Sequence, residues 1–225
     1  MKVLDLFCGM GGWSIGFYRE GFDCVGVDII DVGYPYQLWQ TDIREWQANP
    51  AWNFDVIVSS PPCTEFSPLS RLSYQKGQRA KPDPDKGLEL IRESMRVTME
   101  AQPKYWILEN VYASIPYIHS VLGKPMLIAK PWVLWGNLPN FMFEFEPKRG
   151  GDQKTSHTFE HHGKGGNVLG KGGGRIGLPE DFAFDPLRSW KRARIPVFLS
   201  QSIARAINKE MEDEFIVQPA QIREV

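Results

Sequence analysis

Short apolar runs alternate with amphipathic stretches along the first half of the chain. The apolar runs are rich in β-branched and aromatic residues and predict buried strands at residues 2–7, 24–28, 54–58 and 105–108. Apolar residues recur at helical spacing in residues 13–20 and, more clearly, in residues 85–101. Strands that alternate with helices predict an α/β fold, with a doubly wound sheet and helices on both faces.

The predicted helix at residues 85–101 is preceded by a polar segment. In residues 85–101 the residues at helical spacing are Leu88, Ile91, Met95, Val97 or Thr98, and Met99, and the segment has an acidic start. Residues 67–84 before this helix are polar, contain proline and glycine, and predict a basic loop.

The second half of the chain is less regular. Residues 130–139 are apolar and aromatic and predict a strand and a turn. Residues 195–207 have a proline near the first turn and apolar residues at helical spacing, including Phe198 or Leu199 and Ile203, and predict a helix that packs on the sheet. After Met211 the tail is polar, and we expect it to fray. These patterns divide the chain into a core (1–147), a glycine-rich basic segment (148–194) and a closing helix with its tail (195–225).

The composition is that of a globular protein, with 42% hydrophobic and 24% charged residues among 225. No apolar run is long enough to span a bilayer, and the chain starts directly in a strand pattern, so we expect neither a membrane segment nor a leader. Three cysteines without paired spacing argue against a disulfide framework and against a zinc site. We therefore expect no bound metal and a cytoplasmic location.

Two features at predicted strand ends suit a nucleotide-like ligand. A glycine-rich turn at residues 8–12 joins a strand to a helix, where backbone N–H groups can approach a ligand closely. Asp28 ends the next strand and suits the two hydroxyls of a ribose, and Asp42 suits the exocyclic amine of an adenine. The alternatives are a tight connection for the turn and solvated loop positions for the carboxylates.

The strand at 54–58 runs into Ser-Ser-Pro-Pro-Cys (59–63), which places Cys63 on a stiff loop at a strand end. A stiff loop suits a nucleophile, although a lone Pro-Cys is more often a buried cysteine beside a turn. The next predicted strand ends at Glu109, one helix later. In a parallel sheet with right-handed crossovers these two strand ends lie side by side, so we expect Cys63 and Glu109 around one pocket.

Three segments resemble, in order and spacing, motifs of the cytosine-C5 DNA methyltransferases: residues 5–12 (Asp-Leu-Phe-Cys-Gly-Met-Gly-Gly), 61–67 (Pro-Pro-Cys-Thr-Glu-Phe-Ser) and 109–111 (Glu-Asn-Val). The resemblance covers about the first half of the chain. The family's Gln-Arg-x-Arg type motif and its long target-recognition domain are not visible in the second half. Residues 130–139 look like a segment of small, phage-type relatives.

The resemblance implies a Rossmann-like methyltransferase sheet that uses S-adenosylmethionine and acts on DNA. It implies that Cys63 is the nucleophile that adds to cytosine C6, and that Glu109 holds and donates a proton at ring N3. Asn110 would fix the backbone around Pro62 and Cys63, and Ser67 completes the implied catalytic set. The implied cofactor contacts are Phe7, Cys8, Gly9, Met10, Gly11, Gly12, Asp28, Ile29, Asp42, Ile43 and Pro61.

A duplex cytosine cannot reach such a pocket, so a flipped base or a single-stranded substrate is implied. Residues 148–194 carry ten basic and five acidic residues, a balance that suits phosphate contacts although the whole chain carries −1. Our candidates for such contacts are Arg71, Arg79, Lys154, Lys164, Arg192 and Arg194, with solvated loops as the alternative. Methylation of RNA or of a free cytidine nucleotide stays open, as does a weakly active DNA-binding subunit that needs a protein partner for target recognition.

Overall fold

A computed structural model of the chain describes residues 1–129, 132–139 and 195–217. Their helices and strands are, in order, β1 (Lys2–Leu6), α1 (Gly12–Arg19), β2 (Asp23–Asp28), β3 (Gln37–Gln40), β4 (Val56–Ser59), α2 (Pro68–Gln75), α3 (Pro84–Ala101), β5 (Tyr105–Val111), α4 (Ile115–Leu122), β6 (Leu127–Ala129), β7 (Trp132–Asn137) and α7 (Val197–Val217). Short 3-10 turns lie between them: η1 (Pro50–Trp52), η2 (Cys63–Glu65) and η3 (Tyr112–Ser114).

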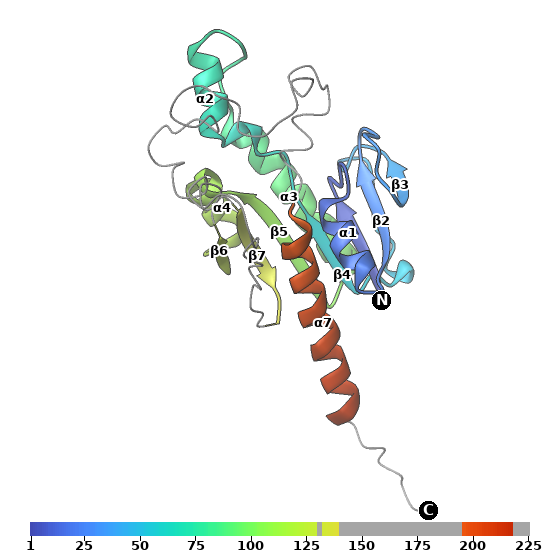
Figure 1. Cartoon of the computed structure of the whole chain (residues 1–225). Coiled ribbons are helices and arrows are strands. Elements are labelled where there is room, and N and C mark those ends of the chain that lie inside the picture. The colour runs from blue at the N-terminus through green and yellow to red at the C-terminus, as the bar shows by residue number, and fades with distance from the viewer. Residues whose placement is uncertain (130–131, 140–194, 218–225) are drawn as a thin grey trace, which may run out of the picture.

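The described strands form one sheet in the order β3-β2-β1-β4-β5-β7-β6 (Figure 1). The first five strands of this order pair in parallel, whereas β7 is antiparallel to both β5 and β6. The strand order reverses between β1 and β4, which is the place where open α/β sheets form a crevice at their carboxyl ends. The loops after β1 and β4 therefore share the edge at which a ligand is expected.

Helices cover both faces of the sheet, as the alternation of the strand residues requires. Val3, Val56 and Val58 belong to the core on the side of α1 and α7. Leu4 and Ile57, one residue along in each strand, belong to the core on the opposite side, with α3. The predicted doubly wound α/β fold is confirmed.

Helix α7 packs along α1, and the two run side by side in Figure 1. The close approach occurs at Gly16, where an added Cβ would lie only 1.9 Å from Ser200 Oγ. Ile203 is fully buried in this contact, while Phe198 is 41% exposed, which decides between the alternatives for the buried position in favour of Leu199. The predicted fraying after Met211 was wrong for residues 212–217, because α7 continues to Val217. The remainder of the tail, residues 218–225, lies outside the described residues.

Contacts from α7 to the sheet explain its length. Tyr105 Oη at the start of β5 donates a hydrogen bond to Glu210 Oε1 at 2.8 Å. Lys104 forms an ion pair with Glu214 one turn later. These partners lie more than 100 residues away, so a local pattern could not show them.

The prediction of a loop over residues 67–84 was wrong in part. Residues 68–75 form helix α2, with Pro68 in its first turn and Ser67 as its N-cap, accepting from the Leu69 N–H at 3.3 Å. The predicted helix over 85–101 is present as α3, in which Met99 is 67% exposed.

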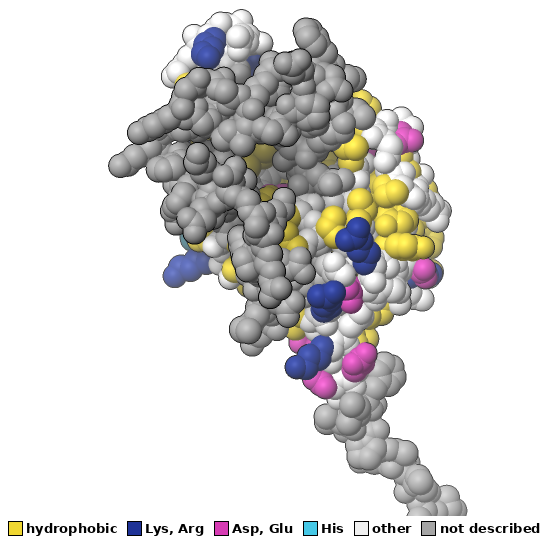
Figure 2. Space-filling view, viewed as in Figure 1, with side chains coloured by type: hydrophobic (Ala, Val, Ile, Leu, Met, Phe, Trp, Pro, Cys, Tyr) yellow, Lys and Arg dark blue, Asp and Glu magenta, His cyan; other side chains and the backbone are white. Residues whose placement is uncertain are grey.

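Aromatic side chains gather at the β3 edge of the sheet, and Figure 2 shows hydrophobic side chains on the surface over β2 and β3. Trp46 and Trp52 stack with ring centroids 5.6 Å apart, and the ring centroids of Trp39 and Trp52 are 4.8 Å apart.

Among the described residues, no helix has the length and apolar character needed to cross a membrane. Within the described ranges, no cluster of three or more His, Cys, Asp or Glu side chains could hold a metal ion.

Candidate active site

Cys63 lies on the loop that leaves β4, beside the end of β5. β4 and β5 pair in parallel with Ser59 opposite Leu108, so the next residue of β5, Glu109, lies level with the start of this loop. The expected side-by-side arrangement of the two strand ends is confirmed. Glu109 lies within β5 rather than on a loop, because β5 extends to Val111 through its pairing with β7.

Asn110 holds the loop in place from the neighbouring strand. Its Nδ2 donates to the Pro61 carbonyl at 3.1 Å, and its Oδ1 accepts from the Val111 N–H at 2.9 Å. Both polar atoms of the buried Asn110 amide are therefore hydrogen-bonded to backbone groups. This contact fixes the Pro61-Pro62 backbone that precedes Cys63.

The pKa values of both Cys63 and Glu109 are raised. Burial raises the pKa of the Cys63 thiol to about 11, and the negative charge of Glu109 adds to that rise. Burial also raises the pKa of Glu109 to about 7, against the opposing effect of a hydrogen bond from the Ser60 side chain. A protonated Glu109 would remove the like charge beside the thiol, so the acid form of Glu109 and the thiolate form of Cys63 favour one another.

The residues after Cys63 are tied down by an arginine. Arg79 Nη2 pairs with Glu65 Oε1 at 3.1 Å, and its Nη1 donates to Ser70 Oγ at 2.7 Å and to the Thr64 carbonyl at 3.3 Å. Glu65 in turn accepts from the Asp83 N–H at 2.7 Å. This clamp joins η2, α2 and the start of α3 into one support for the loop.

Three predicted site residues have structural partners in this region. Arg79 is engaged in the clamp, and Arg71 donates from the surface to Tyr117 Oη at 2.7 Å. Ser67 caps α2, and its N–H donates to the Cys63 carbonyl at 3.0 Å. Phosphate contacts for the two arginines and a catalytic role for Ser67 stay predictions.

The glycine-rich turn after β1 has a left-handed backbone at three positions: φ is 58° at Phe7, 48° at Gly9 and 72° at Gly11. Positive φ is costly for a phenylalanine and marks a conformation held by its surroundings. The Phe7 N–H donates to the Val27 carbonyl at 2.8 Å, and the Gly9 N–H donates to Asp28 Oδ2 at 2.9 Å. β2 therefore holds the turn at the crevice between β1 and β4.

Asp28 retains acceptor capacity in spite of these bonds. Its Oδ2 accepts from Gly9 and its Oδ1 accepts from the Ile30 N–H at 3.2 Å, which uses two of about four lone-pair positions. The next residue, Ile29, is 60% exposed beside it. A carboxylate with free acceptor positions next to an exposed apolar side chain suits a ribose and an adenine face.

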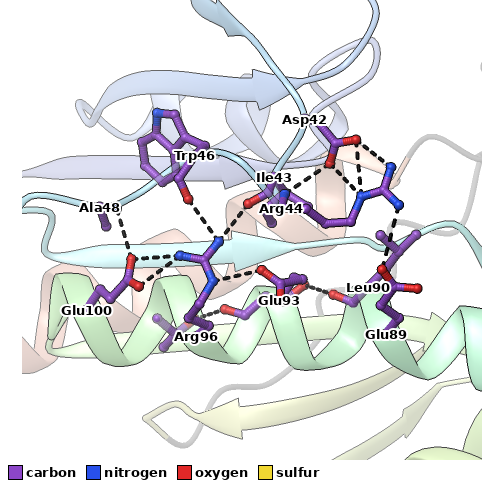
Figure 3. A network of polar contacts seen from close by, with 12 residues as sticks. Asp42, Ile43, Arg44, Trp46, Ala48, Glu89, Leu90, Glu93, Arg96 and Glu100 are labelled. Carbon is purple, nitrogen blue, oxygen red and sulfur yellow. Dashed lines mark hydrogen bonds and ion pairs between the residues drawn. The ribbon is translucent and has the colours of Figure 1, made fainter.

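The segment after β3 is held by α3, as Figure 3 shows. Arg96 Nη2 donates to the carbonyls of Ile43 and Trp46 at 2.7 and 2.8 Å. Asp42 forms a two-armed contact with Arg44, and these hydrogen bonds lower the pKa of Asp42. Asp42 is thus kept ionised near the expected adenine position.

The family comparison agrees with this geometry. A model of the C-5 cytosine-specific DNA methylase family matches residues 1–115, just over half of the 225-residue chain. The chain belongs to this family. The matched region contains the glycine-rich turn, the Cys63 loop and Glu109, so both predicted halves of the site fall within it.

Several known proteins are similar to the family region of the chain. It is 35% identical over 119 residues to a "Probable DNA (cytosine-5)-methyltransferase" of Frog virus 3, covering 49% of this chain and 53% of that protein. It is 32% identical to the type II methyltransferase M.FnuDI of Fusobacterium nucleatum, over 49% of this chain and 32% of that protein. A solved structure titled "Crystal structure of putative DNA modification methyltransferase encoded within prophage" (E. coli) shares 26% identity over 53% of this chain and 34% of that one, with a TM-score of 0.41. The chain spans about half of the viral relative and about a third of M.FnuDI.

Some predicted site residues are buried or lie outside the described residues. The side chains of Cys8 and Ile43 are each 5% exposed. The predicted contacts Lys154, Lys164, Arg192 and Arg194, and the whole of the 148–194 segment, lie outside the described residues. Their roles stay predictions.

Sequence reasoning missed two polar residues of the site. Asp5, in the middle of β1, is fully buried, accepts from Ser14 Oγ at 2.7 Å and has its Oδ1 without a partner among the described residues. A carboxylate inside an apolar run was the available signal. Ser60 accepts a hydrogen bond from Trp13 Nε1 at 2.9 Å, which no local pattern indicates.

Proposed function

We propose that this member of the family transfers a methyl group from S-adenosylmethionine to C5 of cytosine in DNA, through a covalent bond between Cys63 Sγ and C6 of the base. The observation that carries the proposal is the neighbouring placement of the Cys63 loop and Glu109 at the ends of two paired strands, with the negative charge of Glu109 raising the pKa of the Cys63 thiol. A nucleophile beside a carboxyl group with a pKa of about 7 is what addition to a cytosine requires, since one group attacks while the other supplies a proton near neutral pH.

The chain's own residues account for most of the proposed chemistry. The Cys63 thiolate forms a bond to C6, and Glu109 donates a proton to N3, so that the electron pair of the C5–C6 double bond becomes available at C5. S-adenosylmethionine, when bound, supplies the electrophilic methyl group that C5 accepts. Removal of the C5 proton by a base then restores the double bond as the thiolate leaves.

Thiolate is scarce before the substrate arrives. With a pKa of about 11, about one Cys63 in ten thousand is ionised at pH 7. Protonation of Glu109 removes the like charge and shifts this balance toward thiolate. Asn110 keeps the preceding backbone fixed, so the attack geometry does not have to be organised by the substrate.

The turn between β1 and α1 fits the proposed cofactor. Its left-handed residues bring backbone close to the crevice, and Asp28 offers free acceptor positions there. Phe7 and Gly9 would lie along the cofactor, with Asp28 on the ribose and Asp42 on the adenine amine. These placements follow from the resemblance and from the donor and acceptor chemistry.

Methyl transfer from labelled S-adenosylmethionine tests the proposal. Purified protein is offered duplex DNA, single-stranded DNA, transfer RNA and cytidine nucleotides. Cys63→Ala is assayed alongside a matched control, Cys24→Ala, which removes the buried β2 thiol that donates to the Ser14 carbonyl. We expect incorporation into DNA that is lost in Cys63→Ala and kept in Cys24→Ala. Incorporation into RNA or nucleotides alone would contradict the substrate, and label that survives Cys63→Ala would contradict the mechanism.

A partner-dependent subunit is the second candidate, because the family's Gln-Arg-x-Arg type motif and long target-recognition domain are not visible in residues 112–225. Cofactor binding without transfer to any of the four substrates would favour it. Recovery of transfer on adding a protein fraction from the same cells would then identify the missing component.

A further inference from the structure

Tyr34, in the loop between β2 and β3, packs against the glycine-rich turn and against β2. Its side chain is buried, with 8% of its surface exposed. A Cβ added at Gly11 of the turn would lie 3.3 Å from Tyr34 Cε2, and one added at Gly26 of β2 would lie 2.7 Å from Tyr34 Cε1. The ring therefore lies against both backbones, and the two glycines leave the room that it occupies.

The Tyr34 hydroxyl ends a buried chain of hydrogen bonds that reaches β1. Tyr34 Oη and Ser14 Oγ are 2.7 Å apart, and Ser14 Oγ donates to Asp5 Oδ2, also at 2.7 Å. While Asp5 is ionised, this bond uses the one hydroxyl hydrogen of Ser14, so Tyr34 is the donor to Ser14. Burial and the charge of Asp5 raise the pKa of the Tyr34 phenol, so the phenol keeps the proton that it donates.

The carboxylate of Asp5 also takes the place of a cap for α1. Gly11 stands at the N-cap position and has no side chain that could accept from the first-turn N–H groups. The Ser14 N–H donates to Asp5 Oδ2 at 3.3 Å instead, and both residues are fully buried. The start of α1, where the turn ends, is thus held from β1 by Asp5 and from the β2–β3 loop by Tyr34.

The β2–β3 loop is joined to the turn at both of its ends. Asp28, the last residue of β2, accepts from the Gly9 N–H at 2.9 Å. Near the other end, Pro35 lies against the turn as well, since a Cβ added at Gly11 would come within 2.9 Å of Pro35 Cδ. Tyr34, beside Pro35, adds the hydrogen bond to Ser14. The loop cannot move away from the turn without breaking this bond.

We propose that Tyr34 is a positioning residue for the cofactor, which locks the glycine-rich turn and the loop after Asp28 in the arrangement that binds S-adenosylmethionine. The contacts stand on their own, whereas their meaning for cofactor binding rests on the proposed function. A preformed site binds more tightly, because fewer groups have to be ordered when the ligand arrives. Loss of the Tyr34 hydroxyl should therefore weaken cofactor binding without removing any group assigned to a cofactor contact.

The test variant is Tyr34→Phe, and Tyr36→Phe is its matched control. Tyr36 lies in the same loop, with its ring centroid 5.7 Å from that of Tyr34, but its hydroxyl makes no hydrogen bond to any of the described residues. Both substitutions remove one oxygen atom and keep the ring. Only Tyr34→Phe is expected to change the turn.

Two measurements on the full chain need no DNA. Amide hydrogen exchange of the free protein, followed by mass spectrometry, should be about 3- to 10-fold faster in Tyr34→Phe for peptides that cover residues 9–15, because one buried hydrogen bond is lost. The dissociation constant of S-adenosylmethionine, measured by calorimetry, should rise by the same factor of about 3 to 10. Tyr36→Phe should match the unsubstituted protein in both measurements.

Two further readouts separate positioning of the cofactor site from a general loss of stability. Ser14→Ala removes the partner of the Tyr34 hydroxyl, so adding Tyr34→Phe to it should weaken cofactor binding no further. In the methyl-transfer assay, Tyr34→Phe should raise the KM for S-adenosylmethionine and leave kcat at saturating cofactor unchanged. A protein that is merely less stable would not show this split.

The proposal is overturned by unchanged cofactor affinity in folded Tyr34→Phe, by an equal loss in Tyr36→Phe, or by additive losses in the Ser14→Ala, Tyr34→Phe double variant. If the unsubstituted protein bound no S-adenosylmethionine, the proposed function would fail, and the cofactor part of this inference with it. The exchange comparison would then still support or overturn the role of Tyr34 in holding the turn. Unchanged affinity in Tyr34→Phe, in a protein that methylates DNA, would overturn this inference alone.

Discussion

Replacing Glu109 with glutamine should make Cys63 more reactive toward an alkylating reagent, and should do so only where Glu109 is ionised. The carboxylate raises the pKa of the thiol through its negative charge, in addition to the effect of burial. The Glu109→Gln substitution keeps the size of the side chain and removes that charge. With a pKa of about 7, Glu109 carries the charge at pH 9 and has lost most of it below pH 6.

The magnitude follows from the two pKa values. A neighbouring like charge raises a pKa by about one unit, so its removal raises the thiolate fraction at pH 9 about tenfold. Thiolate nucleophilicity falls with pKa, with a slope of about 0.4–0.5, which reduces the net gain to about threefold. Below pH 6 the two proteins should react at the same rate, because both then have a neutral side chain at position 109.

The assay is the rate of iodoacetamide labelling followed by intact mass between pH 5.5 and 9.5. Cys63→Ala gives the background from the buried thiols of Cys8 and Cys24. The expected ratio of Glu109→Gln to unsubstituted rates rises from about one to about three as Glu109 titrates. A ratio that stays constant with pH, or falls below one at pH 9, would refute the coupling between the two groups.

Three other outcomes follow from the packing and the buried charges. Ile203→Ala should lower the free energy of unfolding by about 2–5 kcal/mol in urea, because Ile203 is 0% exposed, whereas Phe198→Ala at 41% exposure should cost less than about 1 kcal/mol. Asp28→Ala should weaken S-adenosylmethionine binding about 10- to 100-fold in calorimetry, through lost hydrogen bonds to a charged group, with exposed Asp31→Ala as the unaffected control. Burial raises the pKa of Asp5 from 3.8 to about 7, so the folded state binds more protons than the unfolded state. The free energy of unfolding should therefore fall as the pH rises from about 4 to about 7. Asp5→Asn should flatten this pH dependence, and an unchanged dependence would show that Asp5 is not its source.

The halves of the site could be predicted because each sits at the end of a short apolar run. Cys63 follows a strand that Pro61 and Pro62 end, and Glu109 directly follows the apolar run at 105–108 of the next strand. Parallel pairing with a right-handed crossover then brings the two together, a rule that needs no knowledge of side-chain contacts. The register of β4 and β5 agrees with it.

What could not be predicted depends on partners far along the chain. Helix α2 was taken for part of a loop because residues 67–84 are polar and contain proline and glycine. Its support comes from the Ser67 cap and from Arg79, which pairs with Glu65. β5 runs past Glu109 because β7 pairs with it in antiparallel fashion. Hydrogen bonds such as these join residues that local patterns cannot connect.

The central claim is that Cys63 becomes covalently bound to the target base, and a trapped complex tests it most directly. DNA containing 5-fluorocytosine allows addition at C6 and methylation at C5, but it offers no C5 proton to remove, so the bond to the enzyme should persist. With S-adenosylmethionine present, intact mass and peptide mapping should show the DNA adduct on Cys63 and none in Cys63→Ala. An adduct on another residue, or methylation of ordinary cytosine with no adduct on the fluorinated base, would contradict the account.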